Sequence, residues 1–84
     1  MIFDDIKVGT KLRFIKHSNV GGSDYRFSIG DIVEVWGIDM NRISLLHIKS
    51  GDNNWGIPKD NKHSLIWLNQ FEIVKKTLSD LIMR

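Results

Sequence analysis

A nine-residue pattern that occurs twice constrains the fold of this chain more than any other feature of its sequence. Both copies, Ile6–Phe14 and Phe27–Val35, read apolar, polar, apolar, Gly, then Thr or Asp, followed by alternating side chains. Glycine tolerates positive φ, and a Thr or Asp side chain can hydrogen-bond to nearby backbone, so each copy predicts a tight turn followed by a strand. The alternation after each turn is typical of strands with one buried face.

The first half of the chain therefore predicts an antiparallel sheet. We expect strands at about residues 10–16 and 31–38, separated by a loop of about ten residues over 17–26 that is rich in Gly, Ser and Asn. The Ile- and Leu-rich stretch Arg42–Lys49 predicts a third strand, and the short turn Asp39–Asn41 before it suits a hairpin.

The second half predicts shorter strands. Leu45 and Leu46 are adjacent within the third strand, so one of them must point outward or sit at a bulge. Trp55–Pro58 reads as a short extended piece at an edge, because proline cannot donate to a ladder. Ser64–Leu68 and Phe71–Val74 read as two further extended pieces.

The C-terminal segment Lys76–Arg84 predicts one or two helical turns. Its apolar residues Leu78, Leu81 and Ile82 have helical spacing, and so short a helix needs a surface to pack on. One hypothesis is that these residues pack against another copy, which would make the protein a structural, self-associating subunit.

Length and composition favour one soluble domain over residues 1–84. The chain is 42% hydrophobic and 26% charged, which is typical of globular domains. It contains no cysteine, so disulfides and thiolate chemistry are excluded, and a cytoplasmic setting is expected. The N-terminus does not resemble a signal peptide, and no apolar stretch approaches the ~20 residues of a membrane span.

Charge and amino-acid usage say little about chemistry. Twelve basic and ten acidic residues leave a net charge of +2, which does not by itself indicate nucleic acid. Alanine is absent while Ile, Lys, Asn and Asp are abundant, a usage that suggests an AT-rich genome such as that of a bacteriophage.

Three stretches give the chain a resemblance to the SH3-like small β-barrel: Ile6–Gly9, Phe27–Val35 and the closing Trp67–Val74. In such barrels an apolar turn with Gly-Asp precedes an alternating strand, and a closing strand returns to the first. The resemblance implies an all-β, SH3-like five-stranded small barrel, here followed by the short C-terminal helical segment. It implies a fold and leaves the function open.

Two subfamilies of this fold suggest functions. The Ala-Leu-Tyr-Asp-Tyr segment and paired tryptophans of proline-peptide-binding SH3 domains are absent. Gly30–Asp39 is similar to half of the KOW element of ribosomal and transcription factors, although the second, glycine-rich half is missing. Binding of nucleic acid or of the transcription machinery therefore stays an alternative.

No motif indicates catalysis, a metal site or a cofactor. His17, His47 and His63 lack the HxH and HExxH spacings of metal sites, and His47 reads as a partly buried strand residue. Asp4 and Asp5 are adjacent in a terminal segment, where solvation or capping is the usual role of carboxylates. A barrel this small fills its interior with its own side chains, so we expect no enzyme.

Tryptophan is the informative residue type for binding. Trp36 falls on the face opposite Val33 and Val35, so it faces outward if the valines point inward. Trp55 follows an Asn-rich loop and is either pinned beneath it or exposed. Trp, Tyr and Arg dominate interface hot spots, so the leading hypothesis is a non-enzymatic module, such as a phage accessory protein, that docks on a protein partner. The residues of this predicted site are Tyr25, Arg26, Trp36 and Trp55.

Two alternatives to that site remain open. Burial of at least two of the three tryptophans in the core would reduce the aromatic surface. A basic loop face could instead bind nucleic acid, with an affinity that falls steeply with salt. The residues of this alternative are Lys11, Arg13, Lys16, Arg26 and Lys49.

Overall fold

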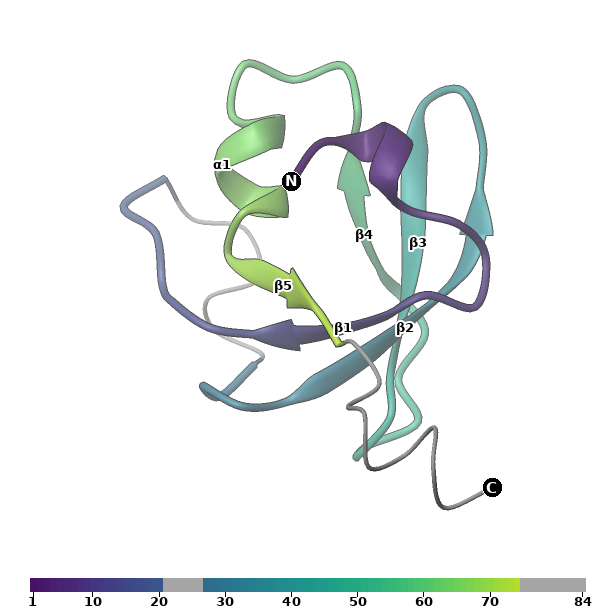
Figure 1. Cartoon of the computed structure of the whole chain (residues 1–84), viewed down its shortest axis with the longest axis vertical. Coiled ribbons are helices and arrows are strands. Elements are labelled where there is room, and N and C mark those ends of the chain that lie inside the picture. Colours follow the sequence, from purple (N-terminus) through teal and green to yellow (C-terminus); the bar gives the residue numbers. More distant parts are fainter. Residues whose placement is uncertain (21–26, 75–84) are drawn as a thin grey trace, which may run out of the picture.

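The computed structural model describes residues 1–20 and 27–74 of the chain. They form a five-stranded antiparallel sheet with strand order β4-β3-β2-β1-β5 (Figure 1). The strands are β1 (Lys11–Phe14), β2 (Ile32–Ile38), β3 (Arg42–His47), β4 (Trp55–Pro58) and β5 (Phe71–Ile73). A 3-10 turn, η1 (Phe3–Asp5), precedes the sheet, and a short helix, α1 (Ser64–Leu68), links β4 to β5. The expected all-β fold class is confirmed.

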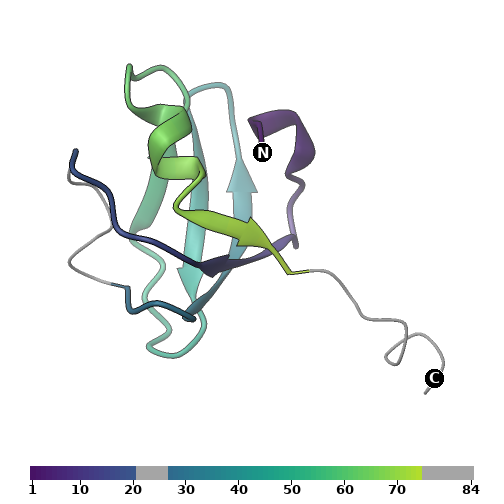
Figure 2. The same cartoon turned by 60° about the vertical axis from the view of Figure 1, so that its left-hand side comes forward.

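The sheet curls into a half-barrel, in keeping with the SH3-like small barrel. In Figure 1, β1 and β5 run across the lower half of the molecule, β3 and β4 run upright, and β2 bends from the first direction to the second. η1 and α1 both lie at the upper end of the molecule, as Figure 2 shows after the rotation. The concave side of the sheet therefore holds the core, while its convex side faces away from both short helices.

Both copies of the repeated pattern form the same turn. In Lys7–Thr10 and in Ser28–Asp31, the fourth residue donates its N–H to the carbonyl of the first, at 3.0 and 2.9 Å. The first residue's N–H donates to the side-chain oxygen of the fourth, at 3.0 Å in each turn. Gly9 and Gly30 have φ values of 94° and 97°, which glycine adopts without strain.

Each turn is bonded to the strand that follows the other turn. The Gly9 N–H donates to the carbonyl of Val35, and the Gly30 N–H donates to that of Phe14, both at 2.7 Å. The N–H groups of Val35 and Phe14 donate in return to the last residue of the same turn, at 2.9 and 2.8 Å. The ribbon of β1 and β2 thus has a local two-fold symmetry that the sequence repeat encodes.

A cluster of three phenylalanines closes the core between β1, β5 and the segment before β2. Phe14 lies 5.4 Å from Phe71 and 5.8 Å from Phe27, and Phe27 lies 5.8 Å from Phe71, all between ring centroids. These separations suit tilted and edge-to-face packing. The whole buried apolar set is Ile6, Leu12, Phe14, Phe27, Val33, Val35, Ile43, Leu45, Ile57, Leu68 and Phe71.

One predicted element is wrong. Ser64–Leu68 was expected to be extended, but it forms α1, and the Trp67 N–H donates to the His63 carbonyl at 3.0 Å. Ser64 and Leu68, four residues apart, are buried, whereas Leu65 and Ile66 are exposed. That burial follows the helical period, so packing of one helical side decided the conformation.

The adjacent leucines alternate between the two faces of β3, and a bulge in β2 lies opposite Ser44 and Leu45. Leu45 is fully buried and Leu46 is partly exposed, as expected for two neighbours in one strand. The register shifts in β2 between Val35 and Gly37, so Trp36 has no partner residue on β3.

Some predictions concern residues that the structure does not describe. Tyr25, Arg26 and the C-terminal helix expected over 76–84 lie outside the described residues. Within 1–20 and 27–74, no helix is long and apolar enough to cross a membrane.

Candidate groove for a partner segment

The two described tryptophans of the predicted aromatic site lie on opposite faces of the sheet. Trp36 is 49% exposed on the convex side. Trp55 packs against the core from the concave side, with its ring 6.2 Å from that of Phe27 and its Nε1–H donating to Asp52 at 2.9 Å. Trp67 also packs against the core, so two of the three tryptophans serve mainly the interior. The structure therefore does not combine Trp36 and Trp55 into one surface.

A different surface has the shape of a binding site. A groove of about 600 Å³ lies between the segment Lys16–Val20 and α1 with its continuation, Asn69–Gln70. On the α1 side, Leu65 is 52% and Ile66 47% exposed. These two adjacent side chains give the groove an apolar wall, and an apolar lining is common in binding pockets. Sequence reasoning missed this wall because it took these residues as part of a strand.

Backbone hydrogen bonds hold the two walls of the groove together. The Ile15 N–H donates to the Gln70 carbonyl at 2.7 Å. The side chain of Gln70, only 1% exposed, forms part of the groove lining, and its Nε2 donates to the Lys16 carbonyl at 3.4 Å. On the opposite wall, the His17 ring packs edge-on against Phe14, with centroids 5.2 Å apart. These contacts tie the part of the groove formed by Lys16, His17 and Gln70 to the core.

The lining of this groove is apolar and basic. Val20, Leu65 and Ile66 supply apolar surface, and Lys16 and His17 supply nitrogen donors. No carboxylate is among the described lining residues, and the remaining ones offer amide and hydroxyl groups: Ser18, Asn19, Asn69 and Gln70. Such a surface suits a ligand that combines apolar side chains with negative charge or backbone carbonyls.

A second, wider hollow of about 1040 Å³ runs along β5 and includes Met1, Asp5 and Arg13. The Arg13 guanidinium forms an ion pair with Glu72 inside it, at 2.9 Å. This ion pair occupies part of the hollow, whereas the smaller groove has the exposed pair Leu65 and Ile66 in its lining, so we favour the smaller groove as the candidate site.

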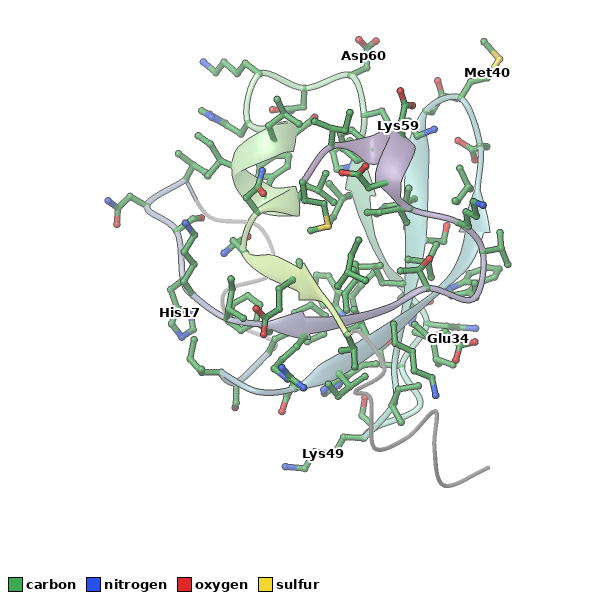
Figure 3. All side chains as sticks on the ribbon, in the orientation of Figure 1. His17, Glu34, Met40, Lys49, Lys59 and Asp60 are labelled. Atoms are coloured by element: carbon green, nitrogen blue, oxygen red, sulfur yellow. The ribbon has the colours of Figure 1, made fainter. Side chains whose placement is uncertain are left out.

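Three of the five basic residues of the nucleic-acid alternative lie near carboxylates. Lys11 lies directly opposite Glu34 in the β1–β2 ladder, and Arg13 pairs with Glu72. Lys49, at the lower end of the molecule in Figure 3, lies close enough to Asp31 to lower its pKa. Lys16 instead lines the groove, and Arg26 lies outside the described residues. Nearby carboxylates thus offset the charge of Lys11, Arg13 and Lys49.

A hydrogen-bonded chain of Asp31, His47 and Ser50 has the residue types of a hydrolase triad. His47 Nε2 lies 2.9 Å from Asp31 Oδ2, and Nδ1 lies 2.8 Å from Ser50 Oγ. His47 is buried in β3, in line with its expected role as a partly buried strand residue. These hydrogen bonds join the second glycine turn, at Asp31, to the loop after β3, at Ser50.

The surroundings of Asp31, His47 and Ser50 favour a structural role for these three residues. Ser50 Oγ accepts the Asp52 N–H at 3.2 Å, and the Gly51 N–H donates to the His47 carbonyl at 2.8 Å. The amides that could stabilise an oxyanion are therefore engaged within the loop. Neither hollow described above is lined by Asp31, His47 or Ser50.

The other ionisable candidates have local roles. Asp5 Oδ2 accepts the Ile2 N–H at 2.9 Å, which confirms capping for this carboxylate. The His63 ring packs against Trp67, with centroids 5.7 Å apart. Over residues 1–20 and 27–74, no three histidines or carboxylates gather as metal ligands would.

The curled sheet defines a small all-β domain, consistent with an SH3-like half-barrel, with a groove beside α1. No family model, no curated protein and no solved structure matches the chain. The function is therefore inferred from the geometry of the groove.

Proposed function

We propose that the protein is a non-enzymatic binding module whose groove between Lys16–Val20 and α1 takes an extended segment of a protein partner. The observation that carries the proposal is the exposed pair Leu65 and Ile66 on the wall of a groove that is tied to the core at Lys16, His17 and Gln70. Anchoring reduces the entropy that binding would otherwise cost.

The chemistry of the lining indicates the kind of segment. An apolar side chain of the partner would cover Leu65 and Ile66, and a carboxylate near it would meet Lys16 and His17.

The biological setting that we propose is that of a small accessory protein, of the type that AT-rich bacteriophage genomes encode, acting in the cytoplasm. Amino-acid usage and the absence of cysteine support this setting.

A peptide-display library tests the proposal against many candidate segments at once. We expect enrichment of segments that combine large apolar residues with Asp or Glu, and NMR shift changes in the protein at Lys16–Val20 and α1. The double variant L65S/I66S should abolish this binding. Val8 and Ile29, which are 63% and 57% exposed at the two glycine turns, provide the control variant V8S/I29S, which should bind normally.

Two outcomes would refute this function. One is a library without enriched segments, and the other is shift changes that avoid the groove. An oligonucleotide titration at low ionic strength decides the nucleic-acid alternative, because phosphate binding would weaken steeply as salt is added.

A further inference from the structure

The convex side of the two central strands is unusually apolar. We define the outer face as the outward-pointing side chains of β2, β3 and the residue after β3. Its apolar members are Ile32, Trp36, Leu46 and Ile48. Trp36 is 49% and Ile48 is 48% exposed. A solvated sheet face normally carries polar residues at these positions, so this face has the composition of a covered one.

The apolar residues of the outer face are neighbours. The Ile48 N–H donates to the Ile32 carbonyl at 3.1 Å, which places these two residues opposite each other. Leu46 lies opposite Glu34, one step along the same face. Trp36 follows at the bulge, beside Ser44 and therefore diagonal to Leu46.

The described chain ends on the same face. The Val74 N–H donates to the Lys11 carbonyl at 2.9 Å, Lys11 lies opposite Glu34, and Glu34 lies opposite Leu46. Val74, Lys11, Glu34 and Leu46 therefore form one row across four strands, with their side chains on the convex side. Figure 3 shows Glu34 pointing away from the core.

We propose that the outer face is the docking site of the chain's own C-terminal segment, residues 75–84, with Leu78, Leu81 and Ile82 packed on Leu46, Ile48 and Ile32 beside Trp36. This inference concerns a surface separate from the groove and does not depend on the proposed function.

The length of the C-terminal segment fits the distance from Val74 to Leu46 across the sheet. Three strand spacings of about 4.8 Å separate Val74 from Leu46, or roughly 14 Å along the row. Four residues in extended form, from Val74 to Leu78, also span roughly 14 Å. One helical turn then advances about 5.4 Å, close to the about 6.6 Å between Leu46 and Ile48 along β3.

Charge and tethering favour this occupant over a second copy. Lys75 and Lys76 follow Val74 in the sequence and would cross the row near Glu34, the carboxylate of the outer face. A linker of so few residues gives an effective concentration of about millimolar. A second copy would have to exceed that concentration to compete.

The test uses the full chain. Because the chain contains no cysteine, a single introduced cysteine can be labelled selectively. A nitroxide on S79C, on the polar side of the segment, should broaden the amide NMR signals of Ile32, Leu46 and Ile48. The triple variant L78S/L81S/I82S in the same background should restore these signals. It should also make Trp36 more accessible to acrylamide. A matched control, T77S/M83S, changes the segment but keeps the three apolar residues, and the broadening should persist.

Three results would overturn the inference: no broadening on the outer face, broadening that the triple variant leaves unchanged, or broadening of isotope-labelled chains by spin-labelled chains in a mixed sample. The last result would assign the face to a second copy, as in a self-associating subunit. Because the groove is a separate surface, failure here leaves peptide binding through Leu65 and Ile66 untouched.

Discussion

Gly9 and Gly30 hold backbone conformations that other L-residues adopt only at a cost. Both have φ above 90°, and a Cβ at either position would meet no other atom within 4 Å, so the cost is conformational rather than steric. We expect G9A and G30A each to lower the free energy of unfolding by roughly 1–2 kcal/mol.

Urea denaturation measures this difference, and Gly37 supplies the control. A Cβ at Gly37 would lie 3.6 Å from Ser44 Cβ, an ordinary contact, and the position lacks positive φ. G37A should therefore change stability less than the other two variants. Equal losses in all three would mean that the turns do not require glycine.

Asp31 makes the free energy of unfolding depend on pH in the acidic range. Its pKa is lowered, chiefly by the hydrogen bond from the Ser28 N–H; partial burial opposes this shift, and His47 and Lys49 lower the pKa further. A carboxyl whose pKa is lower in the folded state contributes stability above its unfolded pKa, and this contribution is lost as the pH falls through the folded value.

We therefore expect D31N to weaken the acid dependence of the free energy of unfolding below about pH 4. At neutral pH the variant should also be less stable, by about 1 kcal/mol, because two hydrogen bonds lose a charged acceptor. Denaturant unfolding over a pH series measures both effects. D60N, at an exposed carboxyl, is the control, and a D31N curve parallel to the wild type would contradict the assignment.

At the scale of elements, sequence patterns predicted strands where local alternation and burial agree. Val33 and Val35 alternate with outward residues and are fully buried, so β2 could be placed from sequence. α1 could not be, because Ser64–Leu68 is too short for its periodicity to separate a helix from a strand. The groove was missed with it, since the exposure of Leu65 and Ile66 follows from the helix.

A pair of leucines in α1 tests its conformation. Leu68 is fully buried and Leu65 is 52% exposed. We expect L68A to lower the free energy of unfolding by about 3 kcal/mol and L65A to change it by less than about 0.5 kcal/mol. Thermal and urea unfolding of the two variants provide the comparison. Similar losses would indicate that both leucines are packed, which this helix does not allow.

The whole molecule depends on a few large side chains, because a domain of this size buries a limited fraction of its surface. Phe27 is 4% exposed and contacts His47 and Trp55 as well as the other two core phenylalanines. Truncating it would open a cavity where β1 and β5 meet the end of β3 and the start of β4.

F27A should cost roughly 3–5 kcal/mol, a large part of the stability of a small domain. F27L, which retains most of the volume, should remain folded with a smaller loss. Circular dichroism melts and dispersion of NMR signals distinguish the two variants. A well-folded F27A protein with near-native stability would show that the half-barrel closes without this contact.

The curled sheet as a whole was predictable from the repeated turn and the strands that follow it. The choice of surface was not. Trp36 and Trp55 are of one residue type and both belong to strands, but β2 and β4 present them on opposite sides of the sheet. Sequence alone does not show which exposed residues share a surface.

The reciprocal bonding of the two glycine turns bears on how the chain finds its correct strand alignment. Sliding β1 against β2 by two residues would keep the same side chains inward, so hydrophobic burial alone tolerates that error. Such a slip would detach both turns at once, because each is bonded to the partner strand at opposite ends of the ribbon. A slip in register thus loses the hydrogen bonds of both turns, so the duplicated sequence favours the native alignment of β1 and β2.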